Sequence, residues 1–180
     1  MHFTTAAISA ILAFTTSASP IIAARDEPVI RSPPFTITAE TYPRVEFNGA
    51  SLTSYHVGPG QNWAILKQGV APRTAYLNGT QAQLESNSGS LVFPFDGGEE
   101  ALLLPGQVGN GKPLRINQEA GSIGLYVDAN NELKINQRPQ RSFYGCRLPD
   151  DSTYAQIFTY YASDAAPPAT CFPLNLKATF

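Results

Sequence analysis

Residues 172–180, FPLNLKATF, form the clearest strand pattern in the chain. Apolar side chains recur there at every second position, namely Phe172, Leu174, Leu176, Ala178 and Phe180. Because successive residues of a strand point to opposite faces, these five side chains are expected to lie together, toward a core. The segment therefore predicts a strand that is buried on one side.

The same alternation continues upstream, interrupted by Gly, Pro, Asn and Asp. The best hairpin pairs residues 123–127 with 133–135, because Asn130 and Asn131 tolerate the positive φ of a tight turn. Further strands are predicted at residues 35–39, 52–57, 74–77, 81–85, 91–95, 114–116, 142–147 and 153–161. Residues 61–68 fit a helix that stops at Gly69, and a strand fits them almost as well.

These segments predict an all-β fold for residues 35–180. Roughly ten to twelve short strands separated by turn signals are typical of a single-domain antiparallel β-sandwich, which is our prediction. A β-trefoil is the alternative. Residues 75–80 and 125–130 look alike and lie 50 residues apart, which is the spacing of a threefold repeat.

Composition excludes several classes of protein. The 180 residues are 43% apolar and 14% charged, with a net charge of −2. A high apolar content with a low net charge disfavours disorder. The balanced charge argues against a nucleic acid or an acidic membrane surface as partner.

The N-terminal residues indicate secretion. Residues 6–14, AAISAILAF, match the apolar region of a signal peptide and are too short to span a membrane. We expect residues 1–18 to be the signal peptide, with cleavage after Ala18 or, as the alternative, after Ala24. Residues 19–34 contain several prolines and are expected to form an extended leader. The predicted location is extracellular or in a cell wall.

The only two cysteines, Cys146 and Cys171, are predicted to form a disulfide, as is usual in an oxidising compartment. The bond is expected to join the two outer members of a three-strand unit, with residues 153–161 between them. Asn78 begins the single Asn-Gly-Thr sequon and is predicted to carry an N-glycan at an exposed hairpin tip.

Known catalytic motifs are absent from the sequence. After signal removal His56 is the only histidine, no G-x-S-x-G occurs, and neither metal nor cofactor sites are predicted. Glycoside hydrolysis needs only two carboxylates, which leaves two candidate sets. These are Asp96, Glu99 and Glu100 in one turn, and Asp128 with Glu132 in another. Polar residues belong in such turns, so we predict that the protein is not an enzyme.

Binding is the better supported class of function. Aromatic rings stack on sugars, and neighbouring amides supply hydrogen bonds. The candidate ligand-binding residues are Tyr55, His56, Trp63, Tyr126, Tyr154 and Tyr160.

Several short motifs resemble a family of small secreted proteins of filamentous ascomycete fungi without an assigned activity. They are Tyr55-His56-Val57-Gly58-Pro59-Gly60, Leu77-Asn78-Gly79-Thr80, Ile116-Asn117, Gly124-Leu125-Tyr126 and Cys146…Gln156-Ile157-Phe158…Cys171…Leu174-Asn175-Leu176. The chain is more loosely similar to fungal phialide-type cell-wall proteins. Both resemblances imply an extracellular, non-enzymatic role.

Three hypotheses of function follow. The favoured one is a secreted, non-enzymatic protein of a cell wall or matrix that binds polysaccharide or another extracellular protein. The second is a host-directed effector or surface antigen, and the third is a small hydrolase that uses a carboxylate pair.

Overall fold

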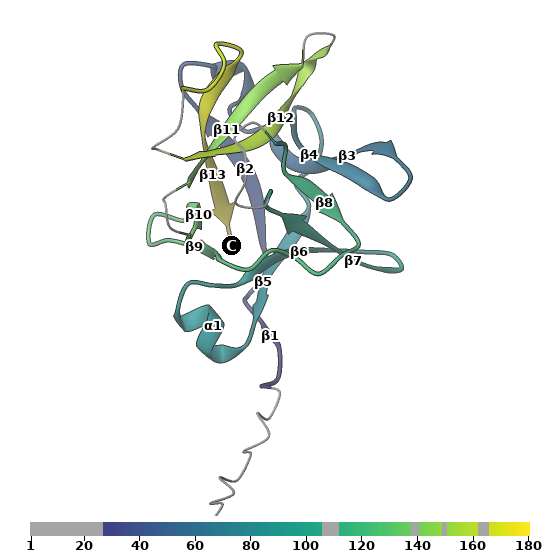
Figure 1. Cartoon of the computed structure of the whole chain (residues 1–180), viewed down its shortest axis with the longest axis vertical. Helices are drawn as coiled ribbons and strands as arrows, with labels where there is room; N and C mark the ends of the chain where they lie inside the picture. Colours follow the sequence, from purple (N-terminus) through teal and green to yellow (C-terminus); the bar gives the residue numbers. More distant parts are fainter. Residues whose placement is uncertain (1–26, 106–111, 138–140, 149–150, 162–165) are drawn as a thin grey trace, which may run out of the picture.

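The computed structural model describes residues 27–105, 112–137, 141–148, 151–161 and 166–180. The predicted signal peptide, residues 1–18, lies outside the described residues, as does the start of the predicted leader. The described chain is all-β, as predicted, with short strands throughout (Figure 1).

The strands are β1 (Ile30–Arg31), β2 (Phe35–Thr41), β3 (Ser51–Gly58), β4 (Gln61–Lys67), β5 (Thr74–Gly79), β6 (Ser90–Phe95), β7 (Gly98–Leu103), β8 (Arg115–Asn117), β9 (Leu125–Val127), β10 (Leu133–Ile135), β11 (Arg141–Leu148), β12 (Asp151–Tyr161) and β13 (Cys171–Thr179). A 3-10 turn, η1 (Val45–Phe47), and a short helix, α1 (Gln81–Glu85), complete the described elements. No helix in the described residues is long and apolar enough to cross a membrane.

Nine strands form a closed barrel, so the predicted sandwich is wrong. The ring runs β2-β5-β6-β7-β8-β4-β12-β11-β13 and returns to β2. This order contains no threefold repeat, and the trefoil alternative is not formed either. Alternation shows that one face of each strand is buried, but it does not show which strands are neighbours. That is why the sequence did not distinguish a barrel from a sandwich.

The barrel closes because β2 is shared among three strands. One edge of β2 pairs with β13, from Thr41 opposite Leu174 to Thr36 opposite Thr179. Its other edge pairs first with β5 and then, at Thr38, with Ser51 of β3. The described part of β3 beyond that point pairs only with β4. The outer part of the β3–β4 hairpin, called the ribbon below, therefore projects from the barrel (Figure 1).

Side chains from every strand of the ring fill the barrel. One buried residue from each of the nine strands illustrates this core: Ile37, Ala75, Phe93, Leu102, Ile116, Leu66, Ile157, Phe143 and Leu176. The alternation predicted for the C-terminal strand is confirmed from Phe172 to Ala178. Phe180, however, is 65% exposed, because β13 ends at Thr179, where its pairing with β2 stops.

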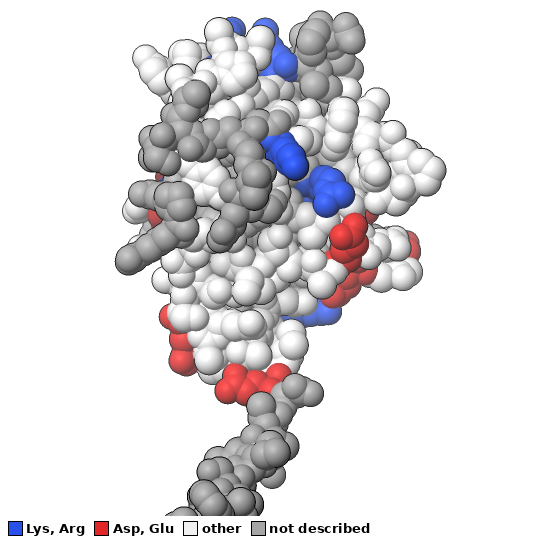
Figure 2. All heavy atoms as spheres, in the orientation of Figure 1, with Lys and Arg blue, Asp and Glu red and all other residues white. Residues whose placement is uncertain are grey.

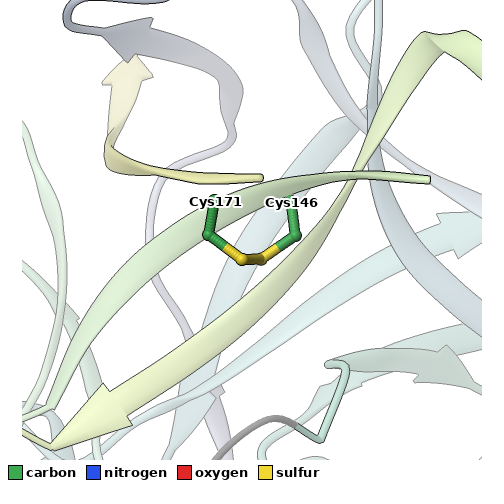
Figure 3. Close-up of a disulfide and its surroundings, with 2 residues drawn as sticks. All are labelled: Cys146 and Cys171. Carbon is green, nitrogen blue, oxygen red and sulfur yellow. A yellow bond between two sulfur atoms is a disulfide. The ribbon is translucent and has the colours of Figure 1, made fainter. Parts of the chain in front are cut away.

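The three-strand unit around the cysteines differs from the prediction. β11, rather than β12, is the central strand, and it pairs with β12 on one side and with β13 on the other. The predicted disulfide is confirmed, with an S–S distance of 2.06 Å (Figure 3). Cys146 lies directly opposite Cys171, so the bond joins neighbouring strands and not the outer members of the unit.

The structure decides the secondary structure of residues 81–85 and 61–68. Residues 81–85 form the helix α1 and not a strand. Thr80 and Gln83 make a reciprocal capping box, in which each side chain accepts a hydrogen bond from the backbone N–H of the other residue. The ambiguous segment 61–68 is the strand β4, which is held between β3 and β12.

Close packing fixes the contact between β11 and β13. Gly145 lies opposite Phe172, and a Cβ atom at Gly145 would lie 2.6 Å from the Phe172 ring. That ring stacks on Phe47, with 5.3 Å between the ring centroids. Gly145 is therefore required by the close approach of a buried ring, which leaves no room for a side chain.

The disulfide is expected to contribute about 2–4 kcal/mol, because it closes a 25-residue separation in the unfolded chain. A Cys146→Ser, Cys171→Ser variant should lose that much in denaturant unfolding, followed by tryptophan fluorescence. The matched Cys146→Ala, Cys171→Ala variant also lacks the disulfide but introduces no hydroxyl groups. Comparing the two variants therefore separates the effect of the lost cross-link from the effect of the added hydroxyl groups. An unchanged unfolding midpoint in both variants would contradict this role.

Gly145→Ala should destabilise the fold by about 1–3 kcal/mol, because the added methyl group overpacks the Phe172 ring. The Phe172→Leu variant removes the ring, so adding Gly145→Ala to it should cost much less. Urea unfolding of the four proteins of this double-mutant cycle measures the coupling. Additive effects would show that the two residues are not in strained contact.

Candidate functional site

Three of the predicted ligand-binding residues lie on the ribbon formed by β3 and β4. Tyr55 pairs directly with Trp63, and His56 pairs with Asn62. Because paired residues share a face and neighbours alternate, Tyr55 and Trp63 lie on one face of the ribbon. His56 and Asn62 lie on the other.

The first face, called the aromatic face below, carries exposed ring surface. Tyr55 is 41% exposed, and its ring centroid lies 5.0 Å from that of Tyr154 on β12. Tyr154 itself is only 8% exposed and supports Tyr55 from below. Trp63 is half-buried and pairs with Arg115 of β8 on its other side. The rings are therefore held in place by neighbouring strands while Tyr55 remains accessible.

The remaining two candidates lie elsewhere. Tyr126 on β9 is half-buried opposite Lys134 of β10. Tyr160 is 7% exposed and contacts the edge of the Tyr144 ring, with 5.1 Å between centroids. Burial, and next the nearby Tyr144, raises the pKa of the Tyr160 hydroxyl. The structure thus brings Tyr55, Trp63 and Tyr154 together on one face of the ribbon, places His56 on the other face, and leaves Tyr126 and Tyr160 elsewhere.

The other face of the ribbon borders a hollow of about 540 Å³, called the polar hollow below. Its lining residues are His56, Gly60, Asn62, Asn117, Gln118 and Glu119. Asn117 is 2% exposed, and its Oδ1 accepts a hydrogen bond from the backbone N–H of Asn62 at 2.9 Å. Its Nδ2 donates to Glu119 Oε1 at 3.1 Å. This buried amide therefore ties the ribbon to the end of β8.

A partly buried ion pair lies beside Asn62, which lines the polar hollow. The Arg73 guanidinium lies 2.8 Å from Glu100 Oε2 and stacks over the Phe93 ring. Glu100 Oε1 lies 3.5 Å from Asn62 Nδ2, which turns the Asn62 oxygen toward His56. His56 Nδ1 then donates to Asn62 Oδ1 at 3.1 Å. Each group thus fixes the orientation of the next.

The carboxylates considered for catalysis make other contacts. Glu99 pairs with Arg31 and its neighbour Glu100 with Arg73, on opposite faces of β7. Asp96 lies at the β6–β7 turn. In the described residues, no group of three or more His, Cys, Asp or Glu side chains is arranged to hold a metal ion.

The second candidate pair stabilises the β9–β10 hairpin. Asp128 Oδ1 accepts hydrogen bonds from the backbone N–H groups of Asn130 and Glu132, each at 2.9 Å. Glu132 bonds to Lys134 and, at 2.7 Å, to Lys177 of β13. These two lysines hold the pKa of the Glu132 carboxyl below its usual range. Glu132 is therefore kept ionised, which is unsuited to a general acid.

Asn78 is not at a hairpin tip, contrary to the prediction. It lies within β5, paired with Arg31 of β1 and Ser90 of β6. The side chain is half-buried, and its Oδ1 is buried without a hydrogen-bond partner. Glycosylation of Asn78 stays a prediction.

Sequence reasoning did not select Asn62, Asn117, Gln118 or Glu119, which line the polar hollow. Asn62 is next to Trp63 in the sequence, and Asn117 follows the buried Ile116. A buried amide at the end of an apolar strand was the available signal. The sequence does not show, however, that the Asn117 amide binds Asn62 of β4, because that contact depends on the pairing of β8 with β4.

The Glu132→Gln variant should lower the thermal midpoint at about pH 7 and converge with the wild type in acid. A carboxyl whose pKa is lower in the folded than in the unfolded state stabilises the fold above the unfolded value of about 4.5. That stabilisation is lost as the pH falls through the lowered pKa. Glu27→Gln, at an exposed position, is the control. Equal differences at neutral and acidic pH would contradict the ion-pair role.

Comparisons with known proteins identify a family. No curated protein and no solved structure matches the chain. The model of a family described as a domain of unknown function, DUF7907, matches residues 32–180, which include the whole barrel and both faces of the ribbon. This bears out the expected membership of a family without an assigned activity. The chain belongs to the DUF7907 family.

Proposed function

We propose that the protein is a secreted, non-enzymatic, carbohydrate-binding protein of a cell wall or extracellular matrix. The observation that carries the proposal is the aromatic face, where Tyr55 is 41% exposed and rests on Tyr154 beside Trp63. A fixed, accessible ring suits the apolar face of a sugar, and stacking costs little entropy when the ring is already ordered.

The surroundings of the ribbon support a carbohydrate ligand. Amide side chains of Asn62 and Gln118 lie on its other face, where they are suited to hydroxyl groups. On the face shown in Figure 2, acidic and basic side chains form small separate groups on a mostly uncharged surface. Such a surface favours a ligand recognised by hydrogen bonds and stacking over a polyanion.

The location and the absence of catalysis rest on other observations. The apolar residues 6–14 and the Cys146–Cys171 disulfide support secretion, because disulfides persist in oxidising compartments. The ion pairs of Glu99, Glu100 and Glu132 support a non-enzymatic role, because each carboxylate already serves a structural contact.

The Tyr55→Ala variant should weaken binding to insoluble wall polysaccharide roughly tenfold, because it removes the stacking ring. Depletion assays on purified β-glucan, mannan, chitin and chitosan measure the effect. Tyr42→Ala is the matched control, since Tyr42 is 82% exposed and lies at the far end of β2 from the ribbon.

Two outcomes would contradict the proposal. Equal loss in both tyrosine variants would place binding outside the aromatic face. Failure of the wild-type protein to bind any of the four polysaccharides would favour the alternative of a host-directed effector or surface antigen.

A further inference from the structure

The polar hollow is distinct from the aromatic face, because His56 and Asn62 point away from Tyr55 and Trp63. Its volume of about 540 Å³ lies within the usual range of small-ligand sites, about 300–1,000 Å³. One sugar unit of a bound polysaccharide therefore has room in the polar hollow, while another unit contacts the aromatic face. The inference below rests on the proposed function and concerns which sugar the polar hollow accepts.

Several hydrogen-bond donors around the polar hollow are already bound within the protein. The Asn62 backbone N–H is bound to Asn117 Oδ1, and Asn117 Nδ2 is bound to Glu119 Oε1. The Asn62 amide nitrogen faces Glu100, and His56 Nδ1 donates to Asn62 Oδ1. The donors that remain are the second hydrogens of these two amides and the side-chain amide of Gln118.

Acceptors, in contrast, remain available. With Nδ1 as its donor, a neutral His56 ring keeps the Nε2 lone pair. Glu119 is exposed, and among the residues that the structure describes only its Oε1 is bound, so Oε2 is left for a ligand. A ligand that donates hydrogen bonds fits these two acceptors.

The charge of the polar hollow also favours a ligand that donates hydrogen bonds. Glu100 is neutralised by Arg73, whereas Glu119 has no ion-pair partner among the described residues. Arg115, the nearest cation along β8, lies opposite Trp63 and forms no ion pair with Glu119. Within the described part of the chain, the charge of Glu119 is therefore uncompensated, and it favours a cationic donor over a neutral one.

We propose that the polar hollow binds the ammonium group of an amino sugar within a polysaccharide, with Glu119 as the charged acceptor. A protonated amino group supplies donors and one positive charge, which suit the two free acceptors, His56 Nε2 and Glu119 Oε2, of which the second also carries the unpaired negative charge. An N-acetylated sugar offers one amide N–H without charge and fits less well. The polar hollow thus selects deacetylated over acetylated units.

Titration calorimetry with glucosamine, N-acetylglucosamine and glucose hexamers at near-neutral pH tests this selection. The wild-type protein should bind the glucosamine hexamer about tenfold more tightly than the other two, and the preference should shrink as salt rises from about 50 to 500 mM. Glu119→Gln should abolish the preference. The new amide oxygen still accepts from Asn117, so the fold is expected to persist.

Matched variants separate this inference from the proposed function. Glu27→Gln removes the same charge at an exposed site outside the polar hollow and should keep the preference. Tyr55→Ala should weaken all three hexamers alike. Equal affinity of the wild type for the three hexamers would overturn the selection but leave carbohydrate binding intact. A preference lost equally in Glu27→Gln would show that it is non-specific attraction. Binding of none of the three hexamers would overturn this inference, and the polysaccharide assays above would then decide the proposed function.

Discussion

The sharing of β2 among three strands is the constraint on which the barrel depends. One edge of β2 is occupied by β13, so the N-terminal and C-terminal strands of the barrel are neighbours. The other edge is divided, with Phe35 and Thr36 opposite β5 and Thr38 opposite β3. The pairing of β2 with β5 closes the ring of nine strands and so leaves it without free edges, which are prone to aggregation.

The same division places the candidate site. Since β5 takes the start of β2, β3 meets β2 at Ser51 and then continues with β4 as its only described strand partner. The β3–β4 ribbon therefore has two accessible faces. The long strands of the barrel, in contrast, have one face packed against the core. A rigid barrel that carries a projecting, partly exposed ribbon is a common arrangement for binding. The buried Asn117 amide and the Arg73–Glu100 pair fix the orientation of groups at its base.

The sequence predicted the strand content and the disulfide because both are local in origin. Alternation identifies buried faces, and two cysteines allow one pairing. The barrel was not predicted, because closure depends on which distant strands share β2. The strand predicted at residues 81–85 is a helix because Thr80 and Gln83 form a capping box, which outweighs the short alternation of apolar residues there.

The candidate site was predicted in part, for a similar reason. Tyr55, His56 and Trp63 are close in sequence and therefore remained together in the structure. Asn117 and Glu119 join them only through the pairing of β8 with β4, and the alternation of a single strand carries no information on that pairing.

The central claim is that one projecting ribbon on a closed barrel is the binding site, and chemical-shift mapping tests it most directly. An amide-resolved NMR titration with glucosamine hexamer should shift the resonances of residues 55–63 and 117–119. Residues of β13 and β2, which form the closure, should stay unchanged. Shifts concentrated at the distant hollow between Tyr42 and Leu174, or spread over the barrel strands, would contradict the account.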